Sequence, residues 1–178
     1  MSAPKVPSVK DLMSPTPAWC VPHDTPEQAA RLMAKHDCGA IPVVDDPLGR
    51  RPVGVITDRD IVIRVIARGQ SILDCLVRDV MTPDPVDVHV DASFHDCARA
   101  MMMHRIRRII VVDDRGKLIG IVTDGDLARA CRRDPQLEHD VAVMVEEVSA
   151  SGHQPLSPLI CTAVAGPAIR ADRPEGYS

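Results

Sequence analysis

The sequence predicts an α/β fold in which two copies of one small repeat pack sheet against sheet, related by a pseudo-two-fold axis. The first observation is internal similarity, since VKDLMSPTP from Val9 aligns with VRDVMTPDP from Val77. The second is the pair of short apolar runs IPVV and IIVV, which are typical of strands buried on both faces. The third is an amphipathic helical pattern before each run.

The similarity between the two halves continues through each copy. IPVVDD from Ile41 aligns with IIVVDD from Ile109. After two extra residues in the first copy, GVITDRDI from Gly54 aligns with GIVTDGDL from Gly120. Matches of this density, in the same order, indicate that the chain arose by duplication.

Each copy predicts the order helix, strand, helix, strand, strand, helix. Ser8 and Ser71 suit the N-caps of the opening helices, and Pro15 and Pro83 end those helices and turn the chain. A short extended segment follows, in which apolar residues alternate in the second copy: Val86, Val88 and Val90.

The central helices are expected at about Glu27 to His36 and Phe94 to Arg105, before the IPVV and IIVV strands. Asp-Asp turns lead to the VGVIT and LIGIVT strands, and closing helices follow from Asp60 to Ala67 and from Asp126 to Cys131. A right-handed crossover places the helices on one face of a three-stranded sheet. Since about 60 residues bury too little surface alone, the two units are expected to pair through their sheets.

The predicted domain boundaries place repeat 1 at 5–69 and repeat 2 at 70–133. A further amphipathic helix is expected at 134–150, with apolar residues on one side. From 151 to 178 the sequence becomes rich in Pro, Gly and Ser without periodicity, and a poorly ordered tail is expected.

Composition limits the classes of function. The net charge of −4 argues against nucleic-acid binding, which needs a concentrated basic face. No run of about 18 apolar residues is present, so no membrane span is expected. The first residues lack a stretch resembling a signal peptide, and the six scattered cysteines are expected to be reduced and mostly buried, which indicates the cytoplasm. Because aromatic residues make up only 2%, the core must be aliphatic.

The motif Thr-x-x-Asp occurs at each predicted junction between a strand and a closing helix, as Thr57 to Asp60 and as Thr123 to Asp126. One interpretation assigns the aspartate to the vicinal hydroxyls of a ribose, because a carboxylate offers paired acceptors. The other interpretation is a capping box, in which the threonine and the aspartate satisfy free amides of the first helical turn. Spacing alone favours the capping box, and the two interpretations are compatible.

Together, these motifs resemble a tandem pair of CBS domains, also called a Bateman module, of the stand-alone bacterial type. The resemblance covers about residues 5–133 and rests on DLMSP and DVMTP, IPVVDD and IIVVDD, and GVITDRD and GIVTDGD. It implies that an adenosine-containing ligand, such as AMP, ADP, ATP or S-adenosylmethionine, binds in clefts between the repeats. It also implies a homodimer that regulates an effector, which the sequence does not identify. With the resemblance, the ribose interpretation becomes the preferred one.

The resemblance implies two ligand sites. The first comprises Thr123, Asp126, Arg108, the Cys38–Ile41 backbone including Gly39 and Ile41, and the segment from Ser14 to Ala18. The second comprises Thr57, Asp60, the Arg107–Ile109 backbone including Ile109, and the segment from Thr82 to Val86.

The two expected sites differ in basic residues. Arg108 aligns with Ala40, so the second site lacks the arginine that is expected to bind phosphate, although Arg59 lies near in sequence. An isolated basic cluster is more often a solvated turn, which remains the alternative for Arg108. We expect the site around Asp126 and Arg108 to bind a phosphorylated adenosine ligand more tightly than the site around Asp60.

The sequence contains no arrangement that predicts catalysis. No nucleophile–base pair, P-loop or dinucleotide-binding glycine motif is present, and the histidines lack the HxxxH spacing of a metal site. We therefore expect a regulatory module that is not an enzyme and requires no cofactor. The alternative is a scaffold protein whose clefts have lost their ligand. The arginine missing from one cleft favours this alternative, and the retention of both Thr-x-x-Asp motifs argues against it.

Overall fold

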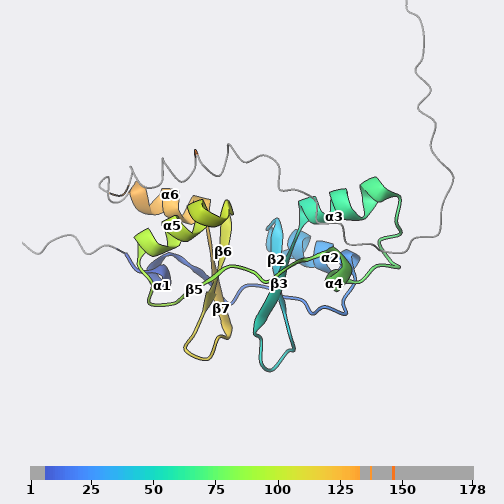
Figure 1. The fold of residues 1–178 in the computed structure, drawn as a ribbon, viewed down its shortest axis with the longest axis horizontal. Coiled ribbons are helices and arrows are strands. Elements are labelled where there is room, and N and C mark those ends of the chain that lie inside the picture. The colour runs from blue at the N-terminus through green and yellow to red at the C-terminus, as the bar shows by residue number, and fades with distance from the viewer. Residues whose placement is uncertain (1–6, 133–136, 138–145, 147–178) are drawn as a thin grey trace, which may run out of the picture.

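The computed structural model describes residues 7–132, 137 and 146, which form two repeats side by side (Figure 1). The first repeat contains α1 (Val9–Leu12), β1 (Ser14–Pro15), α2 (Pro26–His36), β2 (Ala40–Val44), β3 (Pro52–Thr57), α3 (Asp58–Arg64) and the 3-10 helix η1 (Ile66–Arg68). The second contains α4 (Val77–Val80), β4 (Thr82–Pro83), β5 (Asp87–His89), α5 (Phe94–His104), β6 (Arg108–Val112), β7 (Leu118–Thr123) and α6 (Asp124–Cys131). The predicted order of elements is confirmed in the first repeat, whereas the second has one strand more than predicted, because Thr82–Pro83 forms β4 ahead of β5.

The two central helices, α2 and α5, have matching ends. Thr25 caps α2 and Ser93 caps α5, and each side chain accepts a hydrogen bond from the amide three residues later. Both helices end at a residue in the left-handed region, Asp37 (φ 49°) and Arg105 (φ 54°). The chain therefore turns at once into the buried strands β2 and β6, as the apolar runs predicted.

The start predicted for the opening helix of the second repeat was wrong. The Ser71 hydroxyl accepts a hydrogen bond from the Leu73 amide at 3.3 Å, which forms a local turn in place of an N-cap. Helix α4 begins only at Val77, where the Asp79 carboxylate accepts from the Leu76 amide. The closing helices begin two residues earlier than predicted, because the preceding threonines are their N-caps.

The two sheets exchange strands between the repeats. The first sheet has the order β2-β3-β4 and the second the order β1-β7-β6-β5. Strand β1 pairs antiparallel with β7 of the second repeat, with Ser14 opposite Ile121. Strand β4 pairs with β3 of the first repeat, with Thr82 opposite Val55. The opening segment of each repeat thus extends the sheet of the other.

The opening helices make the same exchange. Val9 of α1 is fully buried in the second core, which includes Phe94 and Leu127. Val77 of α4 is fully buried in the first core, which includes Ile41. Each short helix therefore completes the hydrophobic core of the opposite repeat.

The exchange explains why a methionine and a glycine recur in both copies. Met81, which follows α4, packs on Gly54 of β3, where a Cβ atom would lie 2.5 Å from the Met81 sulfur. Met13, which follows α1, packs in the same way on Gly120 of β7. A side chain at either glycine would collide with the methionine that crosses from the other repeat.

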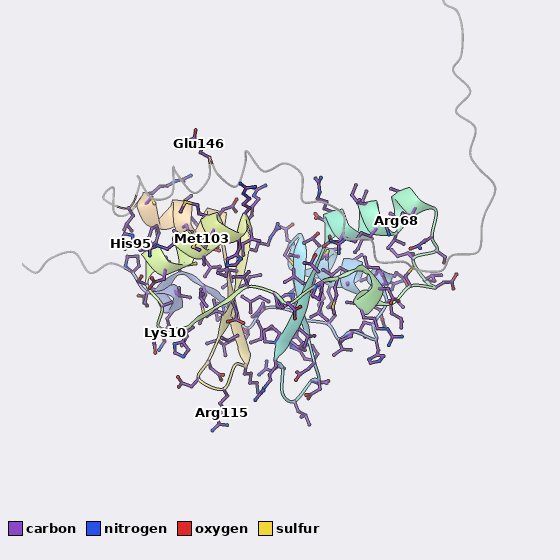
Figure 2. The ribbon with its side chains drawn as sticks, in the orientation of Figure 1. Lys10, Arg68, His95, Met103, Arg115 and Glu146 are labelled. Carbon is purple, nitrogen blue, oxygen red and sulfur yellow. The ribbon has the colours of Figure 1, made fainter. Side chains whose placement is uncertain are left out.

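A third apolar cluster joins the two repeats through their sheets, as predicted. It combines residues of both sheets: Val44, Ile110, Val112 and Leu118, with Trp19, Val21 and Val55 at its edge. The Leu118 amide also donates to the Arg50 carbonyl at 2.9 Å, across the two repeats. The two sheets meet at the centre, and their side chains fill the space between them (Figures 1 and 2).

The expected helix at 134–150 and the expected tail at 151–178 lie outside the described residues, except for Leu137 and Glu146. Leu137 is buried in the second core. Within the described part of the chain, no helix is long and apolar enough to cross a membrane.

The buried cysteines provide a probe for each core. Burial is the main cause that raises the pKa of the Cys20 and Cys97 thiols to about 12, and the negative charges of Asp24 and Asp126, respectively, add to it. Cys20 lies in the first core and Cys97 in the second. Neither thiol is expected to react with an alkylating reagent until its own core opens.

The exchange of helices predicts a crossed response to mutation. We expect Val9→Ala to destabilise the second core by about 2 kcal/mol, because it leaves a cavity beside Phe94. Alkylation of Cys97 should then become about 30-fold faster, while Cys20 changes little. Val77→Ala should instead accelerate the alkylation of Cys20 and leave that of Cys97 little changed. Peptide mapping by mass spectrometry measures both rates, and an effect on the thiol of the same sequence repeat would contradict the exchange.

Candidate functional site

The two Thr-x-x-Asp motifs lie at equivalent corners of the repeats, where β3 meets α3 and β7 meets α6. The Thr57 hydroxyl accepts from the Asp60 amide at 3.0 Å and donates to Asp60 Oδ2 at 2.7 Å. The Thr123 hydroxyl makes the same two contacts with Asp126, at 3.2 and 2.6 Å. The capping-box interpretation is therefore confirmed at both corners.

The other oxygen of each carboxylate lies against an arginine that the sequence analysis did not single out. Asp60 Oδ1 lies 3.3 Å from Arg64 Nη2, and Asp126 Oδ1 accepts a hydrogen bond from Arg129. Both carboxylates are largely buried, with 14% of the Asp60 side chain and 8% of the Asp126 side chain exposed. Their spacing could have revealed both pairs, because residues three and four positions apart on a helix lie on the same face.

Arg64 also contacts residues 80–82, at the end of α4 and the start of β4, which we call the connection. Its Nη1 donates to the carbonyls of Val80 at 2.7 Å and Met81 at 3.0 Å, and its Nη2 donates to the Thr82 hydroxyl at 3.1 Å. Arg64 thereby joins the Asp60 corner to the segment that starts at Thr82, which is one of the two segments predicted to line a site.

Both of these predicted segments cross from one sheet to the other. The first leaves β7, where the Thr16 amide donates to the Ile119 carbonyl, and reaches β2, where the Cys20 amide donates to the Pro42 carbonyl. Ala18 lies half-buried in this crossing. The second leaves β3 at Thr82 and reaches β6, and the carbonyl of the half-buried Val86 accepts from the Ile110 amide at 3.4 Å.

Arg108 reaches from the second repeat toward the first. It begins β6, is exposed, and lies opposite Thr123 in the sheet register. Its Nη2 lies 3.2 Å from the point where a Cβ atom of Gly39 would stand, and Asp58 Oδ2 lies 2.9 Å from the same point. The structure thus brings together three residues of the first expected site, namely Arg108, Thr123 and Gly39.

At the equivalent corner of the second repeat, an arginine of the same repeat binds the aspartate that begins α6. Arg107, which aligns with Gly39, donates from Nε to Asp124 Oδ2 at 2.8 Å. Gly39 has no side chain, and both the Asp58 carboxylate, equivalent to Asp124, and Arg108 of the other repeat lie close to the point where its Cβ atom would stand. This difference makes the two corners unequal in charge.

Comparison with known proteins gives the family of the fold. The sequence profile of the CBS domain matches residues 9–67 and 77–133. The chain belongs to the CBS domain family. The CBS domain-containing protein YhcV of Bacillus subtilis is 40% identical over 121 residues, which are 68% of this chain and 83% of that protein.

Two solved CBS structures hold adenosine compounds. CBSX2 of Arabidopsis thaliana, in complex with AMP, matches with a TM-score of 0.60 and 31% identity, over 71% of this chain and 96% of that one. The CBS domain pair of protein MJ0100, in complex with 5'-methylthioadenosine and S-adenosyl-L-methionine, matches with a TM-score of 0.61 and 29% identity, over 69% of this chain and 98% of that one.

The remaining predicted residues of this CBS pair are either buried in the cores or exposed on a helix. Ile41 and Ile109 are buried, and their side chains belong to the two cores. Their side chains are therefore not available to a ligand, and the contribution of their backbones stays a prediction. Arg59 is exposed on α3, where its amide contacts Asp58.

An open cavity of about 440 Å³ lies next to Gly39 in this CBS pair. Its lining comes from the end of α2, the turn after it and the start of α3: Met33, Ala34, Asp37, Cys38, Gly39 and Asp58. Because Arg108 approaches Gly39 from the second repeat, the cavity is adjacent to the boundary between the repeats.

Proposed function

We propose that this CBS pair is a cytoplasmic regulatory module that binds an adenosine-containing ligand between its repeats and signals to a partner protein by a conformational change. The ligand class is AMP, ADP, ATP or S-adenosylmethionine, as in the solved relatives that hold AMP or 5'-methylthioadenosine and S-adenosyl-L-methionine. One observation carries the proposal: each Thr-x-x-Asp corner ends a strand that pairs with a segment crossing between the repeats.

The chemistry of the corners suits a nucleoside. The Asp60 and Asp126 carboxylates offer acceptors for the two adjacent hydroxyls of a ribose. Half-buried aliphatic residues of the crossing segments, such as Ala18 and Val86, suit the faces of a base, because the chain has few aromatic rings. Arg108 offers a planar, permanently charged group for a phosphate. In this proposal the module performs no catalysis and needs no further cofactor.

The proposed signal is a change in the relative orientation of the repeats. A ligand that contacts a corner of one repeat and the segment crossing to the other binds one orientation better than another. Such a difference in affinity shifts the population toward that orientation. A partner that contacts both repeats then distinguishes the two states.

A second candidate function is a scaffold that binds no ligand. The observation that favours it is the state of the two carboxylates: Oδ2 of each is held by a threonine, and Oδ1 of each lies against an arginine. A ribose would have to share or replace these contacts. Direct measurement of binding distinguishes the two candidates.

A ligand panel provides the first test. We expect at least one of AMP, ADP, ATP and S-adenosylmethionine to stabilise the chain by about 2.7 kcal/mol at a concentration of 100 times its Kd. For a protein of this size, that gain corresponds to a rise in Tm of roughly 8 °C. Thermal shift measures the rise, and calorimetry confirms binding. No shift and no heat across the panel would favour the scaffold.

The difference between the clefts provides the second test. Asp126→Asn should weaken AMP binding about tenfold and more than Asp60→Asn, since Arg108 lies beside Thr123 and adds a contact to phosphate. Calorimetry with AMP measures both variants, and their Tm values serve as controls for folding. Intact affinity in Asp126→Asn together with lost affinity in Asp60→Asn would reverse the ranking of the clefts.

We also propose that the chain forms a homodimer. Large apolar side chains are exposed on α3, on η1, in the loop that follows it and on α5: Val62, Ile66, Leu73 and Met103. Covering such side chains in a second copy removes apolar surface from water. Size-exclusion chromatography with light scattering should give twice the mass of the chain, and a monomer at high concentration would contradict the dimer.

A further inference from the structure

The two carboxylates of the proposed ribose sites are backed by arginines at different positions of their helices. Arg64 lies four residues after Asp60, and Arg129 lies three residues after Asp126. The alignment of the repeats places Ala130 at the position of Arg64, and Ile63 at the position of Arg129. The aspartate is therefore the same in both copies, whereas the arginine beside it stands at a different helix position in each. The two corners are chemically different for this reason.

The hydrogen bonds that anchor Arg64 go to groups other than the carboxylate. Its contacts to the connection are hydrogen bonds of 2.7, 3.0 and 3.1 Å, to Val80, Met81 and Thr82. Its contact with Asp60 Oδ1 is an ion pair at 3.3 Å. With 18% of its side chain exposed, Arg64 is held in place by the connection and presents a fixed positive charge to the carboxylate.

Arg129 is bound in the opposite way. It donates a hydrogen bond directly to Asp126 Oδ1, and 65% of its side chain is exposed. Water can hydrate an exposed guanidinium nearly as well as a carboxylate can bind it, so an exposed pair of this kind contributes little stability. The hydrogen bond nevertheless uses the oxygen that faces away from Thr123.

This oxygen is the one that a ribose needs. Oδ2 of Asp60 already accepts from the amide and the hydroxyl of Thr57, and Oδ2 of Asp126 accepts from the same groups of Thr123. A carboxylate oxygen has two lone-pair sites, so Oδ2 is saturated in both corners. New hydroxyl donors must therefore use Oδ1.

We infer that the two arginines act oppositely on ribose recognition: Arg64 positions Asp60 for a vicinal diol, whereas Arg129 competes with the diol for Asp126. The inference rests on the proposed function and adds the residues that set the selectivity of each cleft. The Asp60 cleft is ready to accept hydroxyls and transmits their binding through Arg64 to the connection. The Asp126 cleft can use Oδ1 for a hydroxyl only when Arg129 releases it, and Arg108 adds a contact to phosphate there.

The test isolates one cleft at a time. Arg64→Met is made with Asp126→Asn, which leaves the Asp60 cleft, and Arg129→Met is made with Asp60→Asn, which leaves the Asp126 cleft. Calorimetry compares adenosine, which has both hydroxyls, with 2'-deoxyadenosine, which lacks the vicinal pair. We expect Arg64→Met to weaken adenosine about tenfold and Arg129→Met to strengthen it about threefold, with changes below about twofold for 2'-deoxyadenosine.

The comparison of the two nucleosides separates positioning from a general loss of structure. A merely structural role would change the affinity for adenosine and for 2'-deoxyadenosine by the same factor, and that result would overturn the inference. Effects of the same sign in both clefts would also overturn it. Arg64→Lys, which keeps the charge but cannot span the three acceptors, should lie between the unaltered chain and Arg64→Met.

A measurement without ligand tests the anchor itself. Hydrogen exchange over 81–86 should accelerate in Arg64→Met, while exchange over 14–18 should not change in Arg129→Met. Unchanged exchange over 81–86 would overturn the role of Arg64 even if nucleotides bind. If no compound of the panel binds the unaltered chain, the proposed function fails and this inference fails with it. If the unaltered chain binds adenosine but Arg64→Met does not weaken this binding or Arg129→Met does not strengthen it, only the inference is overturned.

Discussion

The rest of the structure depends on one constraint: Val9 is buried in the core of the second repeat, and Val77 is buried in the core of the first. An opening helix of four residues cannot be stable alone, so it must gain its stability from packing. Because α1 packs in the second core and α4 in the first, the chain that follows each helix has to return across the molecule. These returns are the crossing segments, and the packing of Met13 on Gly120 and of Met81 on Gly54 fixes where they begin.

The candidate clefts follow from the same constraint. A crossing segment adds a strand beside β3 or β7, and these strands end at the two Thr-x-x-Asp corners. The corner supplies acceptors on a capped helix, while the segment supplies backbone and aliphatic side chains from between the repeats. A molecule that spans both would contact two bodies at once. This arrangement gives a CBS pair a physical means to relate ligand binding to the orientation of its repeats.

Local patterns predicted the order of elements and the capped corners, because a repeat, a strand and a capping box each depend on residues near in sequence. The exchange of helices was not predicted, since DLM and DVM are nearly alike and nothing local tells which core they enter. Ser71 was misassigned because a serine before apolar residues suits a turn as well as a cap. The role of Arg64 was missed for a similar reason, since three of its contacts lie 16 to 18 residues away.

The duplication thus explains both the symmetry of the scaffold and the asymmetry of its chemistry. Positions that hold the exchange together, such as the methionine–glycine contacts, are the same in both copies because each has the same packing task. Around the clefts the Thr-x-x-Asp motifs are also the same in both copies, whereas other positions have diverged, as Gly39 and Arg107 show. Since the two corners have the same backbone arrangement, a difference in what they bind is expected to come from a few side chains. Arg64, Arg107, Arg108 and Arg129 differ from their counterparts in charge, and they are therefore the first residues in which to look for a difference between the clefts.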